Sequence, residues 1–185
     1  VVPSCRSCNE GFSMDEEYVA CLVECVLSGS TKWNTVTREK IRKILQKKTS
    51  LVSMLDGARE ENLFGEVSFK VDIARVKNVV LKLCRGHAAY ELNEPQIDDP
   101  LFVKLWPLPL LSEEDRRQFE TSPASSVWPE VGSRAMQRLV VDTLGANLWV
   151  MAQPGRYRYL TTLEEGIIVR VVLSEYLGCE VRWSL

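Results

Sequence analysis

The hydrophobic pattern of the chain changes near Pro95, and this change limits the possible folds more than any other feature. Before Pro95, apolar residues recur at spacings of three and four, which is typical of amphipathic helices. After Pro95, short runs rich in Val, Leu, Trp and Tyr are separated by Pro and Gly, as expected for strands joined by turns. We therefore predict an α+β fold, with an N-terminal helical layer of about three main helices followed by a mostly antiparallel C-terminal β-sheet.

The expected helices are placed by their start and stop signals. Residues 13–16, Ser-Met-Asp-Glu, match a capping box, so a first helix is expected to follow them and to stop at the Ser-Gly-Ser of 28–30. A second helix is expected over about 37–48, with a short helical piece over 50–59. The third strong helix is expected to start at Asp72 and to end before Pro95.

The region after Pro95 is predicted to be mostly strands. Strands are expected over 101–105, 136–142, 147–152, 157–161, 167–173 and 179–183. Residues 153–156 are expected to form a hairpin turn, and 112–119 a short capped helix. Arg and Tyr alternate over 156–159, which places the two residue types on opposite faces of a strand.

A length of 185 residues allows one full-sized domain, or one domain with a small appendage. We divide the chain into a metal-site segment (1–12), a helical region (13–95) and a β-rich region (96–185), and we expect the last two to pack as one domain. No apolar run approaches the roughly 20 residues that span a bilayer, and 1–17 has no apolar core like that of a signal peptide. We expect a cytoplasmic protein with no membrane partner.

The first cysteine pair is the most informative motif. Cys5 and Cys8 can both reach one tetrahedral zinc ion, but such a pair needs a second Cys or His pair to close the site. Two further interpretations remain open. The pair can be two free thiols, or it can join Cys21 and Cys25, which share a helix face, in a four-cysteine site. Cys21 and Cys25 have apolar neighbours, however, and cysteine often serves as a small core residue.

The segment VPSCRSCNEGFSMDEEY, with its C-x-x-C-N followed by Gly-Phe-Ser, resembles an uncharacterised bacterial family of the HNH endonuclease class. The stretches KNVVLKLCRGHAAYEL, GRYRYL and EYLGCEVRW look like parts of the same family. Its members generally begin with another C-x-x-C and a His-Val or His-Ile-Pro element, and neither is present in this sequence.

The resemblance implies a metal-dependent nuclease. It implies that Cys5 and Cys8 form half of a structural zinc site and that Asn9 is a helix-borne ligand of a divalent metal such as Mg or Mn. No residue matches the histidine base, since the only histidine, His87, lies far downstream. We expect the C-terminal bulk of an HNH-like nuclease, inactive as this chain. The alternative is a non-catalytic interaction or oligomerisation protein with a vestigial zinc knuckle.

The net charge of −2 excludes a uniformly basic nucleic-acid binder, but the charge is unevenly distributed. Up to Tyr90 there are 14 Lys and Arg against 11 Asp and Glu, and from Glu91 onward 9 against 14. Two basic stripes in the front half are candidates for phosphate contact with DNA, or are ordinary solvated helix faces; their residues are Arg38, Arg42, Lys43, Lys47, Arg75 and Lys82. His87 is expected to be a packed core residue, and a homo-oligomer is a further possible partnership.

Overall fold

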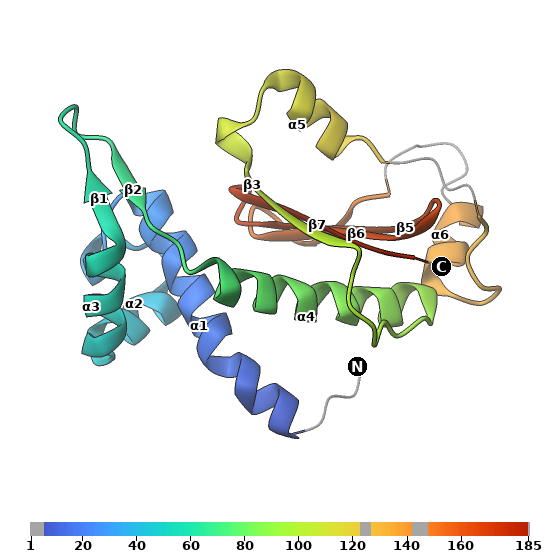
Figure 1. Ribbon diagram of the computed structural model, residues 1–185, viewed down its shortest axis with the longest axis horizontal. Coiled ribbons are helices and arrows are strands. Elements are labelled where there is room, and N and C mark those ends of the chain that lie inside the picture. Colours follow the sequence, from blue (N-terminus) through green and yellow to red (C-terminus); the bar gives the residue numbers. More distant parts are fainter. Residues whose placement is uncertain (1–5, 123–126, 142–147, 185) are drawn as a thin grey trace. The chain divides into compact units, whose positions relative to one another are not determined.

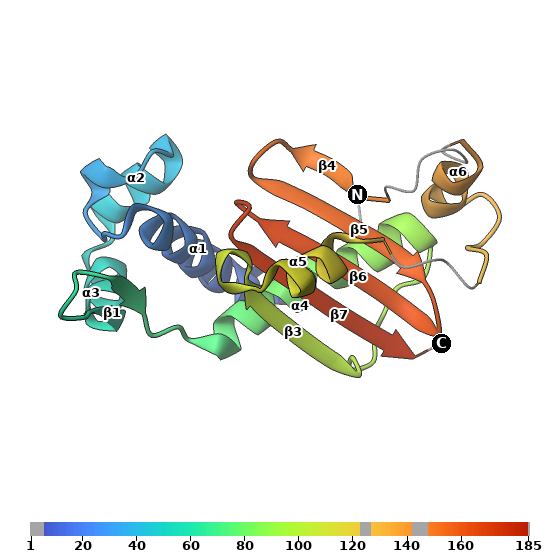
Figure 2. The same ribbon diagram turned by 90° about the horizontal axis from the view of Figure 1, so that it is seen from above.

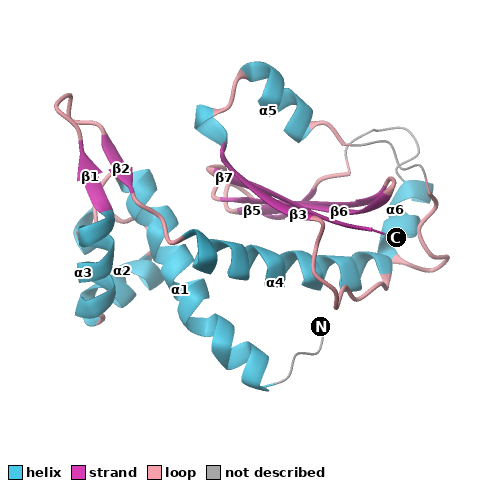
Figure 3. Cartoon of the chain, in the orientation of Figure 1, coloured by secondary structure: helices cyan, strands magenta, loops and turns pink. Residues whose placement is uncertain are grey.

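The computed structural model describes residues 6–122, 127–141 and 148–184, with side chains from residue 12 onward. Helices come first and a five-stranded antiparallel sheet comes last, which confirms the α+β class (Figure 3). The chain divides into two compact units between Val79 and Val80, inside the helix α4 (Ile73–Leu92). The packing of the two regions as one domain stays a prediction. No described helix has the length and apolarity needed to cross a membrane.

The first unit is built from helices and one hairpin. Its helices are α1 (Arg6–Ser28), η1 (Trp33–Thr35), α2 (Glu39–Lys47) and α3 (Thr49–Ala58), and its hairpin pairs β1 (Arg59–Glu61) with β2 (Val67–Phe69). The buried residues of α1 include Tyr18, Cys21, Leu22 and Cys25, each at most 4% exposed. This helical spacing confirms that the stretch 18–26 packs one apolar face into a core.

The predicted helix start at 13–16 was wrong, because these residues lie inside α1, which is already helical at Arg6. A capping pattern at Ser13 marks a helix start only if the preceding residues are not helical. Extending an existing helix adds one hydrogen bond for each residue fixed, so the helix can continue through such a pattern. The end was placed correctly, since α1 ends at Ser28 and Gly29 adopts a φ of 63°.

Helix α4 begins where the sequence predicted. The backbone N–H of Arg75 donates to Oδ1 of Asp72 at 3.3 Å, so the aspartate caps the first turn. The helix ends at Leu92, and Asn93 has a φ of 61°. Every fourth residue is buried in a continuous stripe of Val76, Val80, Cys84, Ala88 and Leu92, all at most 2% exposed.

The second unit contains the sheet, whose strands lie in the order β3-β7-β6-β5-β4 with every neighbouring pair antiparallel (Figure 2). Five of the six expected strands are present, namely β3 (Phe102–Pro107), β4 (Val150–Gln153), β5 (Tyr157–Leu163), β6 (Gly166–Leu173) and β7 (Leu177–Ser184). Between β3 and β4 lie η2 (Leu108–Leu110), α5 (Glu113–Glu120) and α6 (Arg134–Val141). Ser112 caps α5 by accepting from the N–H of Asp115 at 3.1 Å, as predicted.

The strand predicted over 136–142 was wrong, because its described residues belong to α6. Val140 and Val141 favoured a strand by their β-branched side chains. Ser133 provides the local signal that favours a helix over a strand. Its Oγ accepts from the N–H of Met136 at 3.1 Å and so caps the helix. Residue 142 lies outside the described residues.

The strand register separates the sheet into two different faces. Odd-numbered residues such as Val171, Cys179 and Val181 are fully buried and face the Val80–Leu92 part of α4. Helix α5 lies on the other side of the sheet (Figure 1). The even-numbered residues face that side, as the contacts of Arg158 and Arg170 with α5 show, and they include Glu180 and Arg182. The odd-numbered face therefore packs against α4, while the even-numbered face combines charged side chains with a small apolar cluster of Leu108, Phe119 and Val172 beneath a short helix.

Gly178 allows α5 to approach the sheet closely. A Cβ at this position would lie 2.6 Å from Cδ2 of Leu108 and 3.0 Å from Cζ of Phe119, both of which are buried. We predict that Gly178→Ala lowers the free energy of unfolding by about 1–3 kcal/mol through overpacking. Gly86→Ala in α4, where a Cβ meets nothing within 4 Å, should raise it by about 0.5–1 kcal/mol. Urea denaturation of both variants measures this, and a stabilising Gly178→Ala would contradict the packing.

Candidate functional site

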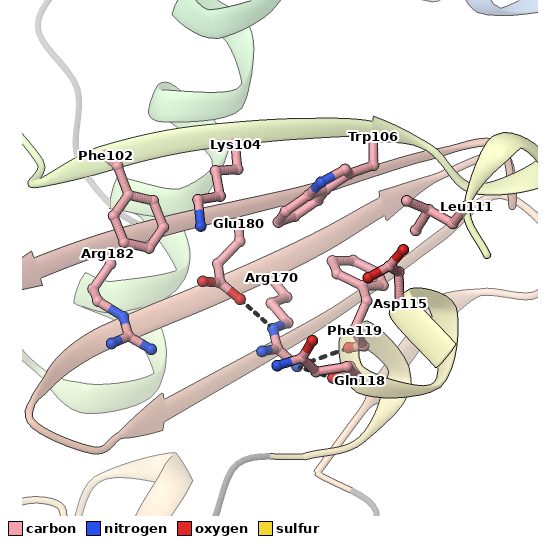
Figure 4. Close-up of a pocket in the computed structure, with 10 residues that line it drawn as sticks. All are labelled: Phe102, Lys104, Trp106, Leu111, Asp115, Gln118, Phe119, Arg170, Glu180 and Arg182. Carbon is pink, nitrogen blue, oxygen red and sulfur yellow. Dashed lines mark hydrogen bonds and ion pairs between the residues drawn. The ribbon is translucent and has the colours of Figure 1, made fainter. Parts of the chain in front are cut away.

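A cavity of about 480 Å³ lies on the even-numbered face of the sheet beside α5 (Figure 4). Its walls combine cations, carboxylates and aromatic rings, from Phe102, Lys104, Trp106, Leu111, Asp115, Gln118, Phe119, Arg170, Glu180 and Arg182. Strands β3, β6 and β7 supply the floor, and α5 with Leu111, two residues before the helix, supplies one wall. This size falls in the range of small-molecule sites, which is roughly 300–1,000 Å³.

The centre of the cavity is held by Arg170, a residue that is only 8% exposed. Its Nε donates to Oε2 of Glu180 at 2.6 Å, and its Nη1 donates to the carbonyl oxygens of Phe119 at 2.7 Å and Thr121 at 2.8 Å. These carbonyls lie at the C-terminal end of α5, where helices leave carbonyl groups without partners inside the helix. Arg170 therefore attaches α5 to the sheet and neutralises the buried Glu180.

Arg158, on the neighbouring strand β5, makes a second attachment outside the cavity. Its guanidinium donates to both carboxylate oxygens of Glu120 at 2.6 and 2.7 Å and also pairs with Glu175 at 3.0 Å. It also lies 4.5 Å from the ring centroid of Trp149. Although burial lowers the pKa of Arg158, its hydrogen bonds to Glu120 and Glu175 raise that pKa above its usual value overall. This arginine is therefore fully engaged by protein groups.

Two cations near Phe102 are less fully engaged. Lys104 is exposed, its Nζ lies 4.7 Å from the Phe102 ring centroid, and it makes no ion pair with a carboxylate in the described part of the chain. Arg182 donates from Nη2 to Oε2 of Glu164 at 3.1 Å, but its Nε is buried without a hydrogen-bond partner. A buried donor without a partner costs roughly 1–3 kcal/mol, so a ligand that accepts from Nε would be favoured.

The residues predicted to bind metal lie at the edge of what the structure describes. Cys5 is outside the described residues, and Cys8 and Asn9 lie in the helix α1, although their side chains are not described. Among the described side chains, no three His, Cys, Asp or Glu are placed to hold one metal ion. The zinc and divalent-metal assignments therefore stay predictions.

The four-cysteine alternative is wrong, because Cys8 and Cys21 lie in one continuous helix. Thirteen residues at about 1.5 Å each separate them by about 20 Å along its axis, far beyond the reach of a single zinc ion. Cys21 and Cys25 are fully buried, and burial is the main reason that their pKa values are raised, to about 12 and about 11. Cys21 and Cys25 are therefore core thiols, as their apolar neighbours in the sequence indicated.

Most of the predicted DNA-contact residues of α2 and its N-cap already pair with groups of the protein. Nε of Arg38 lies 3.9 Å from Oε1 of Glu24, and Lys43 pairs with Glu39 at 2.6 Å. Arg42 donates from Nη2 to the carbonyl oxygen of Val36 at 3.0 Å. Lys47 is exposed. Of this group, Lys47 is the best placed for contact with a phosphate.

The α4 candidates are Arg75 and Lys82. Nε of Arg75 lies 3.5 Å from Oδ1 of Asp15 and 3.6 Å from Oδ2 of Asp72. Its Cζ lies 5.1 Å from the ring centroid of Tyr18. These contacts hold it against α1. Lys82 is half-buried on the same helix. The stripe predicted on α4 therefore contains an arginine that links two helices.

His87 is packed against tyrosines. Its ring stacks on Tyr159 with centroids 3.7 Å apart, and its Nε2 shares a hydrogen bond with the hydroxyl of Tyr157. Burial is the main reason that the pKa of His87 is lowered to about 4, against a smaller raising effect of Glu91. Glu91 is fully buried, accepts from Tyr159 and pairs with Arg138. His87 is therefore a half-buried residue, packed and hydrogen-bonded as predicted but not fully inside the core, and its lowered pKa favours the neutral form at physiological pH.

Sequence reasoning missed the cavity residues Lys104, Trp106, Arg170 and Arg182. A signal was present, because Arg170 interrupts the apolar run Ile-Ile-Val-Arg-Val-Val, and Glu180 and Arg182 alternate with Val181. A charged residue at every second position indicates a strand with one polar face. The pattern does not reveal which strands are neighbours, so the cluster could not be assembled from it.

Comparison with known proteins adds no relative: no family model, curated protein or solved structure matches the chain. The function of the site therefore has to be argued from its own residues.

The burial of His87 predicts a pH dependence of stability. Because its folded pKa of about 4 lies below the ordinary 6.5, the unfolded chain binds the extra proton between these values. Stability due to this residue is therefore complete above about pH 6.5 and falls toward pH 4, by up to about 1.4 kcal/mol per pH unit. Urea denaturation of the wild type and of His87→Phe between pH 4 and 7.5 measures the difference, and parallel curves would contradict it.

Proposed function

We propose that this chain is the nucleic-acid-binding part of an HNH-like, metal-dependent nuclease. The observation that carries the proposal is the sheet-face cavity, in which Lys104 and Arg182 lie beside the aromatic rings of Phe102 and Trp106. Cations neutralise backbone phosphates, and aromatic rings provide surfaces on which bases stack. Proteins that bind single strands combine both features in one groove.

The front motif supports the nuclease part of the proposal. Asn9 follows the C-x-x-C pair directly and lies in the helix α1, which agrees with the helix-borne ligand that the HNH resemblance implies. Cys5 and Cys8 would supply half of a structural zinc site. A cytoplasmic location, where DNA is accessible, belongs to the same proposal.

Binding of the full chain to a fluorescent oligonucleotide, followed by anisotropy at several salt concentrations, tests the nucleic-acid part. We expect affinity that falls with salt. Lys104→Gln should weaken binding and reduce the slope of log K against log salt by about one. Lys77→Gln, which removes an exposed cation from α4, is the matched control and should leave both unchanged.

Two other outcomes of this binding experiment would contradict parts of the proposal. If Lys47→Gln weakens binding and Lys104→Gln does not, the contact surface is the α2 face and not the cavity. If the chain binds neither DNA nor RNA at low salt, the nucleic-acid part of the proposal fails.

The metal part has a separate test. Because one cysteine pair cannot close the site, we expect the full chain to keep only weakly bound zinc after incubation with the metal. The double variant Cys5→Ser/Cys8→Ser should lose that zinc, because serine hydroxyls do not replace thiolate ligands. Atomic absorption measures the zinc content. Cys21→Ser/Cys25→Ser is the matched control for cysteine content, and it should keep its zinc as long as circular dichroism shows it folded. Equal zinc in the Cys5/Cys8 variant would contradict the assignment.

A further inference from the structure

The sheet-face cavity has two chemically different ends, and one ligand can fill both only if it matches each of them. Figure 4 shows Phe102, Lys104 and Arg182 at one end, and Trp106, Leu111 and Phe119 at the other. Arg170 and Glu180 lie between them as a neutral pair. A ligand that fills the cavity must therefore carry an anionic group and a flat or apolar group on one short frame.

The cationic end has the geometry of a phosphate site. Phe102 pairs with Arg182 and Lys104 pairs with Glu180 across strands β3 and β7, so Lys104 and Arg182 are diagonal neighbours on the same face. Such neighbours are separated by about 7–8 Å at their backbones, and both side chains are long enough to meet one phosphate. The partnerless Nε of Arg182 is a buried donor, and the ammonium of Lys104 makes no ion pair among the described residues.

The aromatic end suits a nucleobase. Trp106 packs against the edge of Phe119 with ring centroids 5.5 Å apart and an interplanar angle of 63°, and Leu111 completes an apolar wall. The exposed side chains of Gln118 and Asp115 lie beside this wall on α5. A glutamine amide both donates and accepts, and a carboxylate accepts from an exocyclic amino group, so both can bond the edge of a base.

The spacing of the two ends matches one nucleotide. Lys104 and Trp106 are two residues apart on β3, which separates their backbones by about 7 Å, a distance that a sugar bridges between a phosphate and its base. A cavity of about 480 Å³ has no room for a base pair in its helix, so the base must be unpaired.

We propose that this cavity binds one unpaired nucleotide of a single-stranded nucleic acid, with its phosphate at Lys104 and Arg182 and its base against Trp106. The inference rests on the proposed function and narrows it from nucleic acid in general to a single-stranded substrate. Gln118 and Asp115 would bond the edge of the base.

The test compares a fluorescent oligonucleotide as a single strand with the same sequence in a duplex, using the full chain. We expect the single strand to bind at least tenfold more tightly. Trp106→Leu keeps an apolar side chain but removes the stacking surface, so it should weaken single-strand binding by about tenfold or more. Trp128→Leu, which removes a tryptophan that is 73% exposed outside the cavity, is the matched control and should not change it. Circular dichroism confirms that each variant is folded.

A competition experiment with a nucleoside monophosphate and its nucleoside tests the cationic end of the cavity separately from the aromatic end. A nucleoside monophosphate should compete with the oligonucleotide better than its nucleoside, and Lys104→Gln, a change at an exposed side chain, should remove this difference. Equal competition by nucleotide and nucleoside on the wild type would overturn the phosphate assignment.

The possible failures are distinguishable. Equal affinity for single strand and duplex, with no effect of Trp106→Leu, overturns the inference but leaves the proposed function standing. No binding to any nucleic acid overturns both. A free nucleoside monophosphate that binds as tightly as the oligonucleotide overturns the single-strand assignment, because it makes a free nucleotide the ligand.

Discussion

Arg158 is a second attachment, but the position of α5 over the cavity depends first on the buried side chain of Arg170. It lies in the middle of β6, neutralises Glu180 on β7, and donates to two carbonyls at the end of α5. A buried ion pair is weak evidence for stability, since desolvation offsets much of the attraction. Its effect here is to fix position, because the guanidinium satisfies the end of a short helix that has little apolar surface of its own. The cavity wall formed by α5 follows from that attachment.

The two faces of the sheet have separate tasks because side chains alternate along a strand. The odd-numbered face packs against α4 and includes the stacked rings of His87 and Tyr159. The even-numbered face carries cations and carboxylates that would be costly in a core, and most are neutralised in pairs. Lys104 and Arg182 are the cavity cations that α5 does not engage. Arg182 pairs with Glu164, whereas Lys104 makes no ion pair among the described residues, so the site is a candidate for an anionic ligand.

Local patterns predicted the fold better than they predicted the site. The helices around 37–48 and 72–94, the capped helix at Ser112 and five of six strands were found, since each rests on periodicity or on a nearby cap. The errors came from equally local signals. Helix α1 continues through the capping box, and the cap at Ser133 outweighs the β-branched residues Val140 and Val141 of α6. The cysteine at position 21 illustrates the limit, because spacing alone could not separate a ligand from a core thiol, whereas burial does.

The sequence by itself determined the α+β class, with the long helices ahead of the five-stranded sheet, the buried stripe of α4 and the alternation that gives the sheet a polar face. It also carries the C-x-x-C-N motif on which the metal proposal rests. Only the tertiary structure decided that β3 lies beside β7 and that α5 lies over the even-numbered face. Strands far apart in the sequence become neighbours through hydrogen bonds and packing that no short pattern encodes. For that reason Lys104, Trp106 and Arg182 form one cavity in the fold, although no pattern in the chain shows that they are neighbours.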